Sequence, residues 1–159
     1  MFKKDGSVTA GNASAITDGA AAITVLSEAA VKAHGVQPQA VLLGAVSVGL
    51  DPARMGLGPV PAVRKLLEKQ RLELAQIDVI ELNEAFASQV LACDRELKMD
   101  HDKLNPNGGG IALGHPTGCS GTRIIVGLVH ELARTKGRYG LATLCVSGGM
   151  GMAVLVERV

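Results

Sequence analysis

Short runs of β-branched residues alternate along the chain with stretches whose apolar residues recur at helical spacing. In the first two thirds of the chain, this pattern predicts strands at Ala22 to Leu26, Ala40 to Val48 and Ile77 to Leu82. It predicts helices at Ser27 to His34, Pro59 to Gln70 and Glu84 to Leu97. The second strand is apolar almost throughout, so we expect it to be buried on both faces.

The last third of the chain continues the alternation. It predicts a short strand at Leu104 to Asn107, a helix at Ser120 to Thr135, and two strands at Tyr139 to Val146 and Met152 to Val156. A glycine-rich turn joins the last two strands, which predicts a hairpin. The order βαβαβαββ indicates an α/β fold with a mixed five-stranded sheet, mostly parallel with an antiparallel edge pair, and helices on both faces. No linker or repeat divides the chain, so residues 1–159 are predicted to form one domain.

The predicted helix Ser120 to Thr135 is unusually apolar. Its first half holds almost no polar face, with apolar residues at Ile124, Ile125, Val126, Leu128 and Val129. A helix of this kind is buried all round. One sheet covers one side only, so we expect a further layer, from a partner chain or a missing domain, to pack over it.

Composition narrows the class of protein. Of the 159 residues, 47% are hydrophobic and 19% are charged, which excludes a disordered chain. The net charge of +1, with scattered Lys and Arg, offers no surface for nucleic acid. No apolar run is long enough to span a membrane, and the N-terminus does not resemble a secretory signal. The three cysteines show neither a disulfide nor a zinc spacing, so we expect no metal site and a cytoplasmic, reducing location.

Glycines are concentrated around one histidine. The loop reads Asn105-Pro-Asn-Gly-Gly-Gly-Ile-Ala-Leu-Gly-His115-Pro-Thr-Gly-Cys-Ser-Gly121. Glycine lets the backbone approach a ligand closely, and Pro116 biases His115 toward an extended conformation. The loop therefore predicts a rigidly presented imidazole that exchanges protons near neutral pH. The alternative is a turn whose histidine only caps the next helix.

Three polar residues lie at the ends of predicted strands. Asn83 follows one strand, the His115 loop follows another, and Cys145 lies near the end of a third. In a parallel sheet these ends meet at one edge, where ligands bind. Taken singly, Asn83 is equally well explained as a helix N-cap and Cys145 as a small buried apolar residue. Together they indicate a catalytic site, and we expect the three side chains to face one cavity.

The chain resembles the C-terminal half of the thiolases, a family of acetyl-CoA acetyltransferases and 3-ketoacyl-CoA thiolases. Four blocks carry the resemblance in family order: Thr9 to Ser14 with Asp18 to Ala22, Asn83 to Phe86, Gly108 to Gly121, and Cys145 to Gly151. They cover essentially the whole chain.

This resemblance implies a role for each matching residue. Asn83 would hold a water that, with His115, forms an oxyanion hole, and His115 would also help to deprotonate the nucleophilic cysteine. Cys145 would act as general acid and base at the α-carbon of acetyl-CoA, which requires a thiol pKa drawn down toward neutrality. The backbone N–H groups of Ser147 or Gly148 would contribute to a second oxyanion hole.

The resemblance also implies how substrate is held. Ser14 and Met55 would line the pantetheine pocket, and Phe86 would line the acyl site. The substrates would be coenzyme A thioesters, with no other cofactor. Acyl chain length and the direction of the reaction stay open.

The chain departs from the family pattern at Ser147, where glycine is usual, and at Ala15, which follows Ser14 in place of glycine. A positive φ at Ser147 would cost roughly 1–2 kcal/mol. The larger departure is the nucleophilic cysteine of the N-terminal half, because neither Cys93 nor Cys119 matches its context.

We therefore expect the chain alone to be inactive, and to pair with an N-terminal half or with a copy of itself in a homo-oligomer. Whether it is a fragment, a split subunit or a degenerate protein stays open. One alternative is a catalytically inactive CoA-binding or scaffolding module. Another is a relative of the β-ketoacyl synthases, which Cys145 disfavours because that family has histidine near the final glycines.

Overall fold

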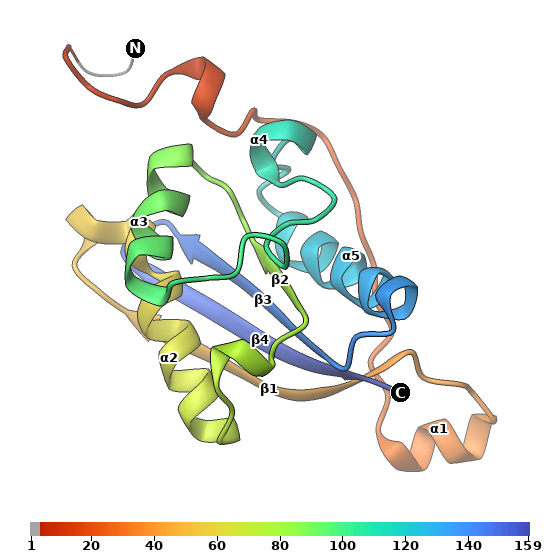
Figure 1. The fold of residues 1–159 in the computed structure, drawn as a ribbon. Helices are drawn as coiled ribbons and strands as arrows, with labels where there is room; N and C mark the ends of the chain where they lie inside the picture. Colours follow the sequence, from red (N-terminus) through yellow and green to blue (C-terminus); the bar gives the residue numbers. More distant parts are fainter. Residues whose placement is uncertain (1–3) are drawn as a thin grey trace.

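The computed structural model describes residues 4–159, and these residues contain a four-stranded sheet in the order β1-β4-β3-β2 (Figure 1). Its strands are β1 (Ala40–Gly49), β2 (Val79–Leu82), β3 (Tyr139–Val146) and β4 (Met150–Arg158). β4 is antiparallel to both of its neighbours, and β2 is parallel to β3. The carboxyl ends of β1, β2 and β3 therefore lie at one edge of the sheet. The α/β fold with a mixed sheet is confirmed, although the sheet has four strands and not five.

Most predicted helices are confirmed within a few residues. The helices are α1 (Glu28–His34), α2 (Pro59–Gln70), α3 (Ala87–Leu97), α4 (Gly110–Leu113) and α5 (Ser120–Thr135). Three 3-10 turns accompany them, η1 (Ala10–Asn12), η2 (Pro52–Leu57) and η3 (Leu74–Gln76). The helix predicted from Glu84 begins three residues later, at Ala87. No helix in the described part of the chain is long and apolar enough to cross a membrane.

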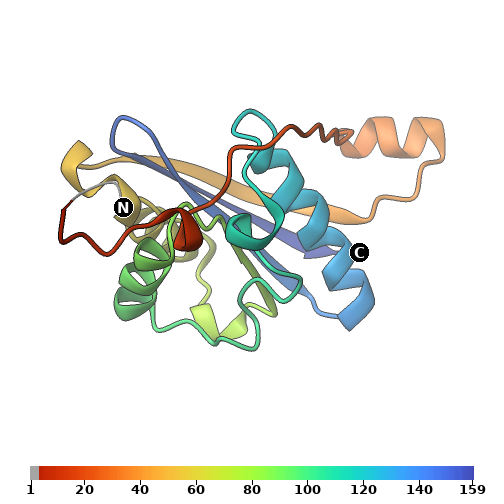
Figure 2. The same ribbon diagram turned by 90° about the horizontal axis from the view of Figure 1, so that it is seen from above.

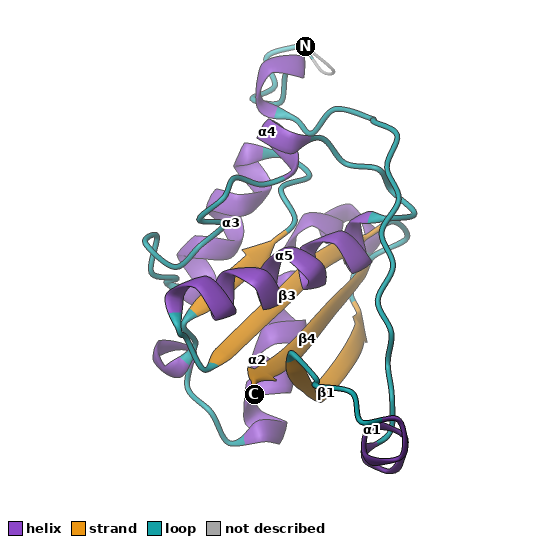
Figure 3. Cartoon of the chain, turned by 90° about the vertical axis from the view of Figure 1, so that its right-hand side faces the viewer, coloured by secondary structure: helices purple, strands orange, loops and turns teal. Residues whose placement is uncertain are grey.

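Helices cover both faces of the sheet, as predicted. α2 packs on β1 and β4, and α5 packs on the opposite face against β2 and β3 (Figures 2 and 3). Each face has its own aliphatic core. On the α2 side it includes Val63, Leu66 and Leu155, and on the α5 side Leu128 and Leu132.

The prediction of a strand at Ala22 to Leu26 is wrong. The segment is extended, but it pairs with no strand among the described residues. Val25 is 71% exposed, and the segment runs past α5 toward α1, which stands apart from the sheet (Figures 1 and 2). No described strand lies beside this segment to complete its backbone hydrogen bonds. The short strand at Leu104 to Asn107 is likewise reduced to one parallel bridge, from Leu104 to Ile80.

β1 is not buried on both faces. The hairpin of β3 and β4 lies inside the sheet, because β4 pairs with both β1 and β3, and this leaves β1 at the edge. The prediction of a mostly parallel sheet with the hairpin at its edge is therefore wrong, because two of the three strand pairings are antiparallel and the antiparallel pair at the edge is β1 with β4. Val41 and Leu42, which point to opposite faces of the sheet, are 48% and 54% exposed.

α5 is not buried all round within this chain. Ile124, Leu128 and Leu132 are buried at helical spacing against the sheet, whereas Gly127 and His130 are exposed. The neighbours Ile125 and Val129 are only partly buried. The sheet covers one side of the helix, and the other side is exposed at Gly127, His130 and Ala133.

Candidate active site

The predicted residues Asn83 and Cys145 lie at the same edge of the sheet. The Asn83 N–H donates to the carbonyl of Thr143 at 3.0 Å, which continues the parallel pairing of β2 with β3. Cys145 is two residues further along β3. The end of β1 reaches the same edge, where the Leu50 N–H donates to the Gly149 carbonyl at 2.8 Å.

The Asn83 amide is buried, and no described residue makes a hydrogen bond with it. The residue is 1% exposed, and neither Nδ2 nor Oδ1 makes a hydrogen bond. Oδ1 lies beside Gly110, where an added Cβ would be 3.3 Å away. α3 begins after Phe86, so the N-cap explanation for Asn83 is wrong. A buried, unpaired amide costs about 1–3 kcal/mol, which marks this position as a place for a bound polar group.

A short segment, Ala13 to Ala15, joins the Asn83 loop to His115; we call it the strap. The Ser14 N–H and Oγ both donate to the Ala85 carbonyl, at 3.0 and 3.2 Å, and Ala13 pairs with Phe86. On its other side, the His115 N–H donates to the Ala15 carbonyl at 2.8 Å. Ser14 and Phe86 are both half-buried in this region. The strap therefore places Ser14 between the Asn83 loop and His115, with Phe86 of that loop beside Ala13.

His115 is held by its backbone and by one ring nitrogen. Gly114 adopts a φ of 87°, and a Cβ there would meet Thr17 at 2.5 Å, so glycine is required. His115 Nδ1 lies 2.6 Å from Ser120 Oγ. α5 has no side-chain cap, so His115 does not serve as its cap. Burial, and then the charge of Arg123, lower the pKa of His115, which favours the neutral imidazole.

Cys145 is buried on the face of the sheet that α2 covers. It is 9% exposed, and burial raises the pKa of its thiol above the ordinary value. Its neighbour Cys93 is fully buried, and burial, with a contribution from Cys145, raises the pKa of that thiol to about 11. A backbone hydrogen bond lowers the pKa of Cys145, but burial is the larger effect and the net shift is upward. No hydrogen bond joins Cys145 to His115, so the relay between them stays a prediction.

The turn after Cys145 accommodates serine without strain. Gly148 and Gly149 have φ of 86° and 84°, whereas Ser147 is not among the residues with positive φ. A Cβ at Gly149 would collide with the Leu50 carbonyl. Ser147 and Gly148 are exposed. The departure from the glycine pattern at Ser147 therefore carries no backbone penalty.

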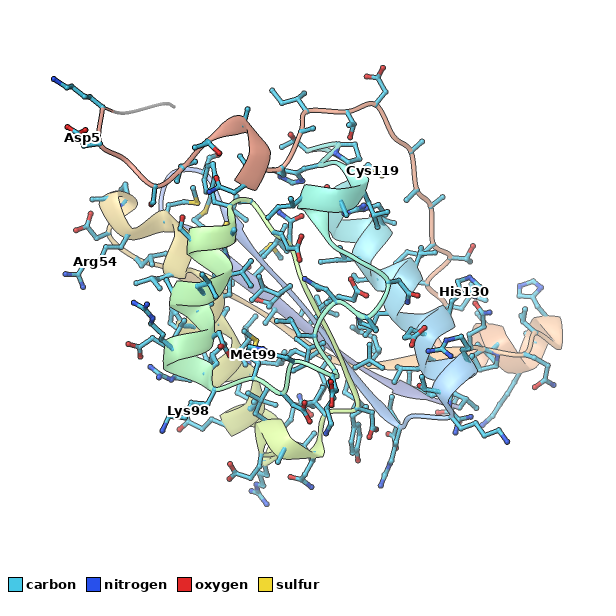
Figure 4. All side chains as sticks on the ribbon, turned by 45° about the horizontal axis from the view of Figure 1, so that its top comes forward. Asp5, Arg54, Lys98, Met99, Cys119 and His130 are labelled. Carbon is cyan, nitrogen blue, oxygen red and sulfur yellow. The ribbon has the colours of Figure 1, made fainter. Side chains whose placement is uncertain are left out.

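Two shallow grooves lie near the predicted residues. One groove, between η2 and α3 beside the half-buried Met55, is lined by Ala53, Arg54, Gly56, Leu57, Ser88, Gln89 and Ala92. The other lies between the extended segment and the start of α5, and is lined by residues 17–21 and 116–119. Arg54 and Cys119, one from each groove, lie on opposite sides of the view in Figure 4. Neither groove is lined by Asn83, His115 or Cys145, so their common cavity stays a prediction.

Sequence reasoning missed the charged and polar residues behind His115. Ser120 is fully buried beside the ring. Arg123, one turn along α5, has a buried Nε without a partner and acts electrostatically on both His115 and Glu81. Glu81 is 7% exposed on β2, and burial raises its pKa to about 7. A glutamate within an apolar strand was the one indication of this cluster in the sequence.

Comparison with known proteins agrees with the fold and the motifs. Residues 36–158 match the family model of the thiolase C-terminal domain, and residues 1–29 match that of the thiolase N-terminal domain. The chain is 57% identical over 154 residues to a beta-ketoadipyl-CoA thiolase of Pseudomonas aeruginosa, covering 96% of this chain and 38% of that protein. It is 52% identical over 157 residues to the mitochondrial 3-ketoacyl-CoA thiolase of Homo sapiens, covering 99% and 40%.

Solved structures give the same result. The crystal structure of the Bacillus anthracis acetyl-CoA acetyltransferase superposes with a TM-score of 0.98 at 51% identity, over 100% of this chain and 40% of that one. The human mitochondrial 3-ketoacyl-CoA thiolase in complex with CoA superposes with a TM-score of 0.92 at 46% identity, over the same shares of each chain.

The chain belongs to the thiolase family. It spans about two fifths of the length of these relatives, and most of it corresponds to the thiolase C-terminal domain.

Proposed function

We propose that this chain supplies the C-terminal part of a thiolase active site. The reaction is acyl transfer between coenzyme A thioesters: two acetyl-CoA give acetoacetyl-CoA and CoA, or CoA cleaves a 3-ketoacyl-CoA. Asn83, through a water, and His115 stabilise the thioester oxyanion, and Cys145 exchanges a proton with the α-carbon. The backbone at Ser147 and Gly148 serves a second oxyanion, while Ser14, Met55 and Phe86 contact the pantetheine and acyl groups.

One observation carries this proposal most strongly: the unpartnered, buried amide of Asn83. It lies beside Gly110 and within reach of the strap that holds His115. An amide left without partners in a folded chain is costly, so its retention favours a role in binding a water or a substrate oxygen. Prepositioned donors are what an oxyanion intermediate requires.

We further propose that the 159-residue chain is inactive by itself, because it lacks a nucleophile in a suitable environment. Cys93 is fully buried with its pKa raised to about 11, and it donates to the Gly56 carbonyl at 3.3 Å. Covalent catalysis needs an accessible thiolate. Within our proposal, the nucleophile comes from an N-terminal thiolase half that packs over α5.

The experiment is complementation. The chain is co-expressed with the part of the Pseudomonas aeruginosa relative that it does not match, and thiolysis of acetoacetyl-CoA is measured by loss of its enolate absorbance. We expect activity from the pair and none from either part. His115→Ala in this chain should abolish the activity of the pair. Full activity of the chain alone, or of the pair carrying His115→Ala, would overturn the proposal.

The raised pKa of Cys145 favours a second candidate, a non-catalytic CoA-binding or scaffolding module. Iodoacetamide labelling distinguishes the two in the assembled pair. An acid/base thiol should label faster than Cys93 and should be protected by CoA. Slow labelling at both cysteines, together with measurable CoA binding, would support the module.

A further inference from the structure

The hydrogen bonds around His115 determine which ring nitrogen carries its proton. Ser120, the first residue of α5, is fully buried, and its Oγ donates to the Pro116 carbonyl at 3.1 Å. A serine hydroxyl has one proton to donate and two lone pairs that accept. When its proton is directed to Pro116, Ser120 Oγ accepts from His115 Nδ1, which lies 2.6 Å away.

We propose that Ser120 is a positioning residue that fixes His115 as the Nδ1–H tautomer and leaves Nε2 as a free proton acceptor. The backbone of His115 is held in place on both sides of the ring. Its backbone N–H is bonded to Ala15, and the residues on either side are Gly114, with a φ of 87°, and the buried Pro116. No described residue makes a hydrogen bond with Nε2.

The charge near the ring favours its neutral form. Arg123 lies one turn after Ser120 on α5, and its positive charge adds to burial in lowering the pKa of His115. The imidazole is therefore neutral near pH 7, and a neutral imidazole has one N–H and one lone pair. Ser120 determines which ring nitrogen carries the N–H and which carries the lone pair.

The consequence for catalysis rests on the proposed function. Nε2 would accept the proton of the nucleophilic thiol of the N-terminal half: the S–H bond breaks, an N–H bond forms, and a thiolate remains. The resulting imidazolium would donate from Nδ1 to Ser120 Oγ and from Nε2 to the developing oxyanion. Ser120 Oγ accepts in both states, so no side chain has to move during the proton transfer.

The test is a spectroscopic one on the whole 159-residue chain. Long-range proton–nitrogen spectra of the ¹⁵N-labelled chain separate the tautomers of its four histidines without any variant. At about pH 8, above the ordinary pKa of histidine, we expect His115 to be the Nδ1–H form. In Ser120→Ala the Nε2–H form should become the major one. Thr117→Ala, an exposed hydroxyl in the same loop, is the matched control and should leave the tautomer unchanged.

Activity of the complemented pair provides a second reading. Ser120→Ala should lower kcat by about 10–100-fold, the range for partners that orient a functional imidazole, with little change in KM. Ser120→Thr, which keeps the hydroxyl, should restore both the tautomer and kcat.

A wild-type His115 in the Nε2–H form would overturn the inference, as would an unchanged kcat in Ser120→Ala. An inactive wild-type pair would instead count against the proposed function and leave the tautomer assignment standing.

Discussion

Asn83 pays a stability cost that its position in the fold does not require. The amide has no partner, and the helix that follows begins without its help. Alanine at this position would remove an unsatisfied polar group, which offsets the loss of packing. Function and stability should therefore separate at this residue.

We predict that Asn83→Ala lowers kcat of the complemented pair by about 10²–10³-fold, the usual effect of losing one oxyanion-hole donor. The free energy of unfolding of the isolated chain should change by less than about 1 kcal/mol. Steady-state kinetics and urea unfolding measure the two effects. Asn105→Ala is the matched control. The Asn105 side chain accepts from the Leu82 N–H and donates to the Leu82 carbonyl, so loss of this side chain should destabilise the fold. Equal destabilisation by the two variants would show that Asn83 is structural.

At this scale, the sequence was informative where a motif surrounds the residue. Asn83, His115 and Cys145 could be singled out from their positions after strands and from glycines nearby. Ser120 and Arg123 could not, because a serine and an arginine at the start of a helix have many ordinary roles. Their relation to His115 depends on how the loop folds back on the helix.

At the scale of elements, the turn between β3 and β4 depends on two different properties of glycine. Gly148 needs a positive φ but has open space around its Cα, whereas Gly151 has no room for a Cβ because the Gly58 carbonyl lies against it. The first constraint is conformational and the second is steric. η2 and α2 therefore pack directly on the backbone of β4 at the candidate site.

We predict that Gly148→Ala lowers the free energy of unfolding by about 1–2 kcal/mol, the cost of left-handed backbone for a residue with a Cβ. Gly151→Ala should cost more, about 3 kcal/mol at the upper end of the usual range for overpacking, because backbone must move to admit the methyl group. Urea unfolding of both variants measures the difference. Equal costs would mean that the contact between Gly58 and Gly151 is not tight.

A second prediction at this scale concerns pH and β2. Burial raises the pKa of Glu81 from 4.5 to about 7, so its protonated form is favoured in the fold. The stabilisation is complete below about pH 4.5 and is lost as pH rises through about 7. Relative to Glu81→Gln, the wild-type chain should lose roughly 2–3 kcal/mol of unfolding free energy between pH 4.5 and 8. Urea unfolding across this range is the measurement.

The control for this experiment is Glu68→Gln, an exposed carboxylate on α2. It should keep the pH dependence of the wild-type chain. A Glu81→Gln variant with the same pH dependence as wild type would show that another group is responsible.

The elements that sequence predicted well are those stabilised by local patterns and by this chain's own core. α2, α5 and β3 have apolar residues that pack within the chain, and their bounds were predicted correctly. The strand at 22–26 failed for the opposite reason, because β-propensity forms a strand only where a neighbour completes its hydrogen bonds. The position of β1 at the edge of the sheet could not be predicted, because the sequence of an apolar strand does not distinguish an edge strand from a central one.

At the scale of the whole molecule, the errors coincide with the exposed apolar surface. Ile16, Ile23 and Val25 of the extended segment are 95%, 47% and 71% exposed, and Leu42 of β1 is 54% exposed. Residues 1–29 match the thiolase N-terminal domain model, and the chain spans two fifths of its relatives. The side of α5 left open by the sheet and the unpaired extended segment (Figure 1) are together suited to a partner layer.

We predict that the isolated chain self-associates, because exposed apolar patches of this kind drive interaction. Sedimentation should show a weight-average mass that rises with concentration. The double variant Ile23→Lys and Val25→Lys should lower this association without lowering the free energy of unfolding, since neither residue packs in a core. Leu91→Lys, at a 57% exposed position on α3, is the control and should associate as wild type does.

Adding the N-terminal part of a thiolase relative should replace self-association by a defined complex if the two compete for this surface. A stable, folded monomer across a wide range of concentrations would contradict the need for a partner layer and, with it, the source we propose for the nucleophile.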